Sequence, residues 1–374
     1  MEGEDEDSEN PRAFNNAKIW KRMIIIIAGA VMNILLGLVL MFITLIPKEN
    51  FASTEISQSG TISFSSITGL QTGDKLVKIN GYDILTYTDL SFALYTLPVT
   101  EVDGNELSIY KEDCLFDLYA YARDQKIETQ EIAAAANAML IRMQPELREA
   151  SDKDAAYQVF CRYYDELNTL LGVESEEYPE ITYIEKRMRY RTDMTVERNG
   201  ERVELKDVDF LTTKSSQDGD PQMNIDFFVL PIDKNFGTMI TQTFAETGAN
   251  IRMVWGSLAG LVTGKFSINE MSGPIGIASA ITTVASESLA TSGFGSAVMS
   301  IVYVMMIITV NLGIINMLPF PALDGGRFLM LLIEAIFKKP VPRKAERIIN
   351  AVGLILLLGL SAVIAVKDII QLIA

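Results

Sequence analysis

Histidine is absent from the 374 residues of this sequence. Zinc sites in hydrolases are built from imidazole, carboxylate and thiolate ligands, and neutral imidazole matches the ion well. This chain cannot supply an imidazole ligand. The sequence therefore excludes a complete His-based zinc site formed by this chain alone.

Cysteine is nearly as scarce, because the chain has only Cys114 and Cys161. Two cysteines in an exported segment could form a disulfide. Two lone cysteines in a long helical region are more often free. We therefore expect free thiols, with a Cys114–Cys161 disulfide as the alternative.

The negative charge of the chain is confined to one region. The net charge is −16, and residues 101–180 alone carry 19 acidic and 7 basic side chains. The acidity thus belongs to one soluble segment and says little about the rest of the chain. No nucleic-acid partner is expected.

Long apolar runs define the class of the protein. Charge-free runs cover residues 23–46, roughly 288–323, and 351–366. The first two exceed the roughly 20 residues that a membrane span requires, and the third comes close to that length when Ile348 and Ile349 are added. The sequence predicts a multi-pass α-helical membrane protein in the lipid bilayer, with a large domain between its first two spans.

Basic residues flank these runs and predict their orientation. Lys18, Lys21 and Arg22 precede the first run, and residues 338–347 carry five more cations. By the positive-inside rule both groups lie in the cytoplasm. Residues 47 to about 290 are then outside, and Asp324 lies toward the cytoplasmic side.

One stretch interrupts the apolar sequence. Residues 316–327 read Asn-Met-Leu-Pro-Phe-Pro-Ala-Leu-Asp-Gly-Gly-Arg. Pro319 and Pro321 remove backbone donors, so a helix ending near Met317 must open into irregular backbone. Asp324 is either the cap of the helix that follows or a functional carboxylate, and the Pro-x-Pro break favours the second role.

This stretch resembles the second metal-site motif of the site-2 proteases, the bacterial intramembrane zinc metalloproteases of regulated intramembrane proteolysis. The resemblance implies that Asp324 is the third zinc ligand and that Asn316, Pro319 and Pro321 belong to the substrate-binding region. In this family a preceding span carries His-Glu-x-x-His, two imidazoles on one helix face with a glutamate as general base. That span is lacking here, although residues 17–22 resemble the basic anchor that follows it.

The first apolar run carries Ala28-Gly29-Ala30 and Asn33, a pattern that also resembles the family helix beside the metal. The resemblance implies that Asn33 contacts substrate. Small residues and a buried Asn equally suit ordinary helix packing. Both roles for Asn33 stay open.

Residues 66–81 contain Gly-Leu-Gln-Thr-Gly-Asp-Lys-Leu-Val-Lys-Ile-Asn-Gly. Asn80-Gly81 and Asn199-Gly200 each lie between alternating apolar residues, which predicts two β-hairpins. The first resembles the core of a PDZ domain, with residues 87–97 as its helix. Residues 100–189 between the two halves have helical patterns at 131–143 and 155–171. They are interpreted as an insertion that is a lid, a partner-binding arm or decoration.

The expected fold is thus a multi-pass α-helical membrane protein with an extracytoplasmic PDZ-like α+β domain carrying a helical insertion. Residues 271–278, Met-Ser-Gly-Pro-Ile-Gly-Ile-Ala, also resemble a family element. The expected segments are a cytoplasmic acidic loop with its anchor (1–22), a span (23–46), the PDZ-like domain (51–210, insertion 100–189), a membrane-surface helix with the Ser-Gly-Pro element (236–280), a span with the Pro-x-Pro break and a following helix (290–337), and a last span (348–366).

Three hypotheses follow for the function. The chain is most of a site-2-type protease that cleaves a membrane-spanning protein such as an anti-sigma factor, with Zn2+ bound only when the His-bearing helix is present. The second hypothesis is that it is a non-catalytic pseudoprotease that binds membrane partners through its PDZ-like domain. The third hypothesis is that it is a fragment, either from a truncated gene model begun at an internal Met or as one half of a split protease that meets a His-bearing helix in trans.

Overall fold

The computed structural model describes residue 14 and residues 17–59, 62–101, 104–125, 129–174, 177–181, 188–213, 222–266, 273–338 and 342–373. The chain forms two compact units, which are described separately. A membrane unit comprises Met1–Glu49 and Asp233–Ala374, and a soluble unit comprises Asn50–Ile232.

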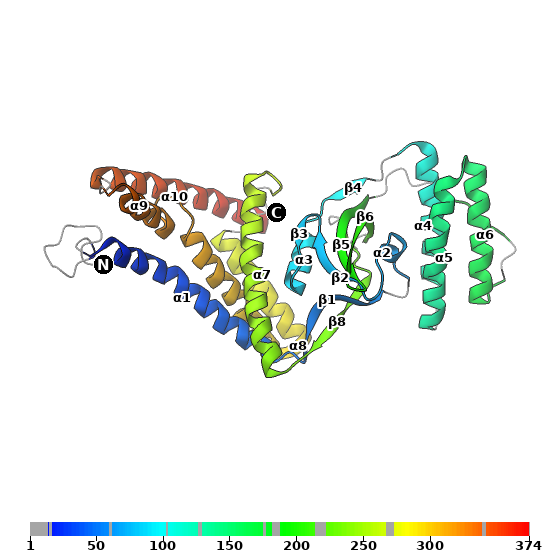
Figure 1. Cartoon of the computed structure of the whole chain (residues 1–374), viewed down its shortest axis with the longest axis horizontal. Coiled ribbons are helices and arrows are strands. Elements are labelled where there is room, and N and C mark those ends of the chain that lie inside the picture. Colours follow the sequence, from blue (N-terminus) through cyan, green and yellow to red (C-terminus); the bar gives the residue numbers. More distant parts are fainter. Residues whose placement is uncertain are drawn as a thin grey trace. The chain divides into compact units, whose positions relative to one another are not determined.

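Helices make up the membrane unit (Figure 1). They are α1 (Ile19–Leu45), α7 (Phe236–Val262), α8 (Pro274–Asn316), α9 (Asp324–Phe337) and α10 (Arg343–Ile373). Among the described residues, three stretches are long and apolar enough to cross a membrane: Ile19–Leu45, Ile275–Asn316 and Lys344–Ile370. The chain is therefore a membrane protein; α9, with 14 residues, is too short to span by itself.

Helix α8 begins earlier than the apolar run at 288–323 predicts. Pro274 occupies its first turn, where a missing N–H costs nothing. Asp368 of α10 accepts hydrogen bonds from the backbone N–H groups of Gly273 and Gly276 at 2.9 and 2.8 Å. Gly293 has a φ of 82° and interrupts the helical conformation. The described end of the Ser-Gly-Pro element is thus the capped start of α8; its Met271 and Ser272 lie outside the described residues.

The soluble unit contains an antiparallel sheet with the order β7-β6-β5-β2-β1-β8. Its strands are β1 (Asn50–Ser59), β2 (Lys75–Ile79), β3 (Tyr82–Asp83), β4 (Val99–Glu101), β5 (Met188–Arg198), β6 (Glu201–Thr213), β7 (Gln222–Met223) and β8 (Phe227–Asp233). Helices α2 (Phe64–Ile67) and α3 (Tyr87–Tyr95) belong to the same unit. This arrangement fits a PDZ-like domain.

Both predicted hairpins are confirmed. Ile79 pairs with Tyr82 across Asn80-Gly81, and Arg198 pairs with Glu201 across Asn199-Gly200. The φ values are 47° and 78° in the first turn and 53° and 83° in the second. Two-residue hairpins of type I′ need positive φ at both central positions, which Asn-Gly provides.

Three helices form the insertion: α4 (Glu106–Asp124), α5 (Gln130–Glu149) and α6 (Lys153–Leu171). Their shared core includes Leu118, Tyr119, Leu140 and Phe160, and Phe64 of α2 joins it. The helical patterns at 131–143 and 155–171 are confirmed by α5 and α6. Cys114 and Cys161 are both free thiols, as expected.

Candidate functional site

Helices α1 and α8 of the membrane unit pack closely against each other. The face that includes Ile26, Ala30, Gly37 and Met41 is buried. A Cβ added at Gly37 would lie 2.4 Å from Cγ2 of Val310 on α8, and one at Gly313 would lie 3.1 Å from the carbonyl oxygen of Ala30. Glycine on each helix therefore permits the backbones of α1 and α8 to approach closely.

Irregular backbone follows α8, as the two prolines predict. The helix ends at Asn316, and the turn is closed by short bonds such as that from Phe320 N–H to the Leu318 carbonyl at 2.7 Å. Ala322 has a φ of 72°, which is unusual for a residue with a side chain. The Ala322 N–H is donated to Oδ1 of Asn350 on α10 at 3.3 Å. We call residues 317–323 the Pro-x-Pro turn.

The Gly-Gly pair after Asp324 is required by this turn. A Cβ at Gly325 would lie 2.3 Å from the carbonyl oxygens of Met317 and Leu318, and one at Gly326 would lie 2.3 Å from that of Phe320. Backbone atoms cannot retreat as a flexible side chain can. The two glycines therefore let the first turn of α9 fold back against the Pro-x-Pro turn, which fixes where Asp324 emerges.

Asp324 is not the cap of α9. Leu323 occupies the N-cap position, no side chain there makes a capping bond, and Asp324 is the first helical residue. Its Oδ2 lies 3.9 Å from the position that a Cβ of Gly29 would occupy on α1. Gly29 itself is exposed. The half-buried Asp324 carboxylate, which has no hydrogen bond or ion pair within the described residues, thus faces an open glycine position on α1.

The other predicted site residues lie around this place. Asn33 is one helical turn after Gly29 on α1, half-buried, and its Cβ lies 3.3 Å from the Cβ position of Gly313. Asn316 is the last residue of α8 and is half-buried; Pro319 is exposed and Pro321 half-buried. The structure thus brings Asp324 to the helix that carries Asn33.

Two interactions at this site were missed in the sequence. Arg22 donates to Glu334 of α9 at 2.8 Å, which joins α1 and α9. Gly353 of α10 approaches the turn so closely that its Cβ would lie 2.5 Å from Cβ of Pro321. Glu334 could have been found, because a lone carboxylate in an apolar helix calls for a partner. Gly353 gave no such signal.

The donor set of this chain does not fit a complete zinc site. The sequence holds no imidazole, and its only two thiols belong to the soluble unit. Glu334 is engaged by Arg22. Across the described ranges, no group of three or more His, Cys, Asp or Glu side chains is placed to hold a metal. Asp324 can supply one ligand, and three or four are needed.

The sequence is similar to known zinc metalloproteases. The family model for Peptidase family M50 matches residues 1–360. Zinc metalloprotease RasP of Geobacillus kaustophilus is 39% identical over 142 residues, which cover 37% of this chain and 31% of RasP.

Two longer alignments reach most of the chain. A Clostridium acetobutylicum protein whose name assigns it to the zinc metalloproteases is 25% identical over 370 residues, 99% of this chain and 78% of that protein. RasP of Bacillus licheniformis is 28% identical over 226 residues, 60% of this chain and 51% of the relative. The similarity therefore extends through both units, although the chain spans about half or less of the two RasP proteins.

Proposed function

Because the chain belongs to peptidase family M50, the site-2 protease family, we propose that it supplies the aspartate side of an intramembrane zinc-protease site. In this proposal Asp324 is a single metal ligand. The remaining ligands come from a His-bearing helix outside the present sequence, supplied in trans or as a further segment of a longer protein. Without that helix the chain is inactive as a protease.

The observation that carries this proposal is the Asp324 carboxylate itself. A carboxylate in a membrane unit is costly when it has no partner. The Pro-x-Pro turn, Gly325 and Gly326 direct it toward exposed Gly29. In this proposal a further helix packs against the exposed Gly29 face of α1 and meets the unused oxygen ligand of Asp324.

Substrate binding is assigned to the surroundings of Asp324. Pro319 cannot donate a backbone hydrogen bond, and Asn316 and Asn33 carry amides that can bind an unwound backbone. Among the described residues neither amide has a hydrogen-bond partner. We propose that these residues hold an unwound part of a membrane-spanning protein, such as an anti-sigma factor.

Zinc binding in the presence of a supplied helix tests the proposal. The chain would be co-expressed with a separate membrane helix carrying His-Glu-x-x-His, and zinc in the purified complex would be measured by mass spectrometry. We expect one zinc per complex and its loss in Asp324→Asn. Glu287→Gln, which changes an exposed carboxylate on α8, is the matched control and should retain zinc. Retention of zinc by Asp324→Asn would exclude the proposed ligand.

A non-catalytic binding protein is the second candidate, and the incomplete donor set favours it. In this case the PDZ-like domain and the Pro-x-Pro turn bind membrane partners without cleavage. It predicts no zinc and no proteolysis even when the His-bearing helix is supplied, while a membrane-spanning partner still co-purifies with the chain. The same co-expression experiment therefore separates the two functions.

We further propose that the soluble unit is extracytoplasmic and that Asp324 lies near the cytoplasmic side of the bacterial cell membrane. The basic residues that precede the first span and the last span support this orientation. In a Cys161→Ser background, Glu201→Cys at the exposed hairpin should react with an impermeant thiol reagent in intact cells. Lys344→Cys should react only after lysis. The opposite pattern would reverse the orientation.

A further inference from the structure

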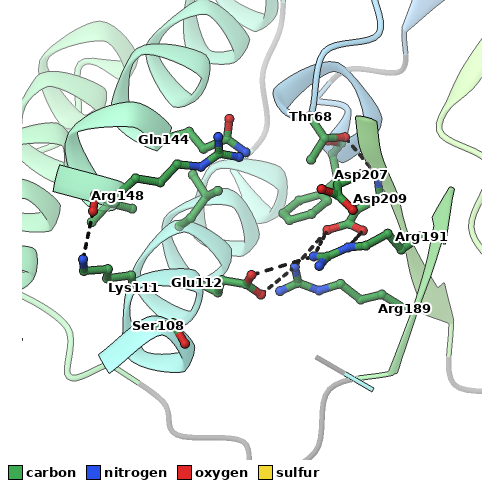
Figure 2. A pocket seen from close by; sticks show the side chains of 13 residues that line it. Thr68, Ser108, Lys111, Glu112, Gln144, Arg148, Arg189, Arg191, Asp207 and Asp209 are labelled. Atoms are coloured by element: carbon green, nitrogen blue, oxygen red, sulfur yellow. Dashed lines mark hydrogen bonds and ion pairs between the residues drawn. The ribbon is translucent and has the colours of Figure 1, made fainter. Parts of the chain in front are cut away.

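The soluble unit contains a cavity of about 280 Å³ between the helical insertion and the sheet (Figure 2). Helices α4 and α5 contribute Lys111, Gln144 and Arg148 to one wall. Strand β5 contributes Arg189 and Arg191 to the other. The insertion and the sheet thus build this cavity together, and it would not exist in either part alone.

Positive charge prevails in the cavity, although the surrounding segment is strongly acidic. Its lining has four cationic side chains, Lys111, Arg148, Arg189 and Arg191. The lining has three carboxylates, Glu112, Asp207 and Asp209. One positive charge is therefore left over, and a bound monoanion would neutralise it.

Arg189 is the most unusual of these residues, because its side chain is only 5% exposed. Its Nη1 lies 3.3 Å from Asp209 and 3.2 Å from Glu112. Its Nε and Nη2 are buried and have no hydrogen-bond partner in the described part of the chain. A buried donor left unpaired is costly, so such atoms call for an explanation.

The neighbouring Arg191 shows what these atoms can hold. Its Nε and Nη2 bind the two oxygens of Asp209 at 2.7 and 2.8 Å. These two atoms form the planar fork that matches a carboxylate. The same two atoms of Arg189 are covered and unpaired within the described residues, and the Phe64 ring centroid lies 5.0 Å from the Arg189 Cζ. The cavity therefore has a second carboxylate-binding edge, two residues from the occupied one, that opens only when the covering side chains move.

The wall formed by α4 and α5, opposite Arg189, offers both charged and apolar surface to the part of a ligand beyond its carboxylate. Arg148 is exposed, and its guanidinium has no ion pair within the described residues, while the Lys111 ammonium donates to the Arg148 carbonyl at 3.0 Å. Leu115 and Leu147 add apolar surface. A ligand with one carboxylate and a small apolar body would meet both kinds of surface.

We propose that this cavity binds a monocarboxylate with an apolar body, with its carboxylate on the Nε and Nη2 atoms of Arg189. The source is a free small acid or the C-terminal residue of a peptide. This site does not depend on Asp324 or on the protease function. Because both nitrogen atoms are covered, neighbouring side chains have to shift when the ligand enters.

Ligand-observed NMR on the full chain in detergent micelles tests the proposal. The probe is N-acetyl-L-leucine, and N-acetyl-L-leucinamide is the neutral control of the same shape. We expect saturable binding of the acid and at least about tenfold weaker binding of the amide, as the loss of one charge-assisted pair implies. Equal binding of both compounds would overturn the proposal.

Variants locate the site. Arg189→Gln should abolish binding, and Arg148→Gln should weaken it several-fold. Arg142→Gln is the matched control, because Arg142 is on α5, exposed and paired with Glu166 away from the cavity. If Arg189→Gln does not fold, the exposed Arg148 decides the question. Retained binding in folded Arg189→Gln, or wild-type affinity in Arg148→Gln where Arg189→Gln does not fold, would refute the site.

A peptide distinguishes the two sources of the carboxylate. N-acetyl-Ala-Ala-Leu with a free C-terminus would be compared with N-acetyl-L-leucine. Tighter binding of the peptide, lost in Arg189→Gln, assigns the cavity to chain ends. Equal or weaker binding of the peptide assigns it to a small acid. Either result supports the carboxylate site, because each requires the Arg189 fork.

Discussion

Gly353→Ala should loosen the Pro-x-Pro turn from α10. The added methyl group would lie 2.5, 2.6 and 2.7 Å from Cβ, O and C of Pro321. Two of these atoms are backbone, so the clash is relieved only by separating α10 from the turn. The hydrogen bond from the Ala322 N–H to Asn350, one helical turn before Gly353, would be stretched as well.

The expected loss of stability follows from three contributions. Overpacking costs about 1–3 kcal/mol, and the weakened hydrogen bond costs about 1 kcal/mol. Alanine is favoured over glycine inside a helix by about 1 kcal/mol, which offsets part of this. The free energy of unfolding of the membrane unit should therefore fall by about 1–3 kcal/mol, the sum of those estimates.

Gly359→Ala is the matched control on the same helix. A Cβ at Gly359 would have no atom within 4 Å, so this variant should be equal to the wild type or more stable. The chain has two tryptophans, Trp20 and Trp255, and both belong to the membrane unit. Tryptophan fluorescence during denaturant unfolding in micelles thus reports on that unit selectively. If Gly353→Ala and Gly359→Ala unfold at the same denaturant concentration, the close approach of Gly353 to Pro321 does not stabilise the turn.

Two further predictions concern the soluble unit. Arg198 donates from its Nε and Nη2 to fully buried Asp74 at 2.7 and 2.8 Å, so Arg198→Ala should lower the free energy of unfolding by about 3–5 kcal/mol in denaturant unfolding. Arg202→Ala, at an exposed position, is its control. Equal unfolding midpoints of the two variants would show that Asp74 does not need the ion pair. Burial raises the pKa of the Cys114 thiol to about 12, so at pH 8 it should resist maleimide until the unit unfolds, whereas half-buried Cys161 should react first. Rapid labelling of Cys114 in the folded chain, seen by mass spectrometry, would contradict this burial.

Local sequence signals predicted the parts of the fold that depend on local geometry. Asn80-Gly81 and Asn199-Gly200 can adopt positive φ, so they specify hairpins almost regardless of context. Pro319 and Pro321 likewise end α8 because they remove donors. In each case the physical cause lies within a few residues of the feature, which is why one sequence was enough.

Contacts between distant helices could not be predicted in this way. Gly353 looks like any glycine in an apolar run until Pro321 is found beside it. The pairing of Arg22 with Glu334 joins residues 312 positions apart. The cavity at Arg189 needs both the insertion and the sheet. Such features depend on which helix faces which, and apolar periodicity does not determine that.

The position of Asp324 is set by backbone packing and not by its own interactions. As the first residue of α9 it gains about 0.3–1 kcal/mol from the positive end of the helix. Asn in its place would forfeit at most that amount, whereas a side chain at Gly325 would meet two carbonyl oxygens at 2.3 Å and could not be accommodated. The turn therefore tolerates loss of the carboxylate and does not tolerate loss of the glycine. This gain is small and the carboxylate has no partner among the described residues, so stability is a weak reason for an acid at this position, and both observations support the proposed ligand role of Asp324.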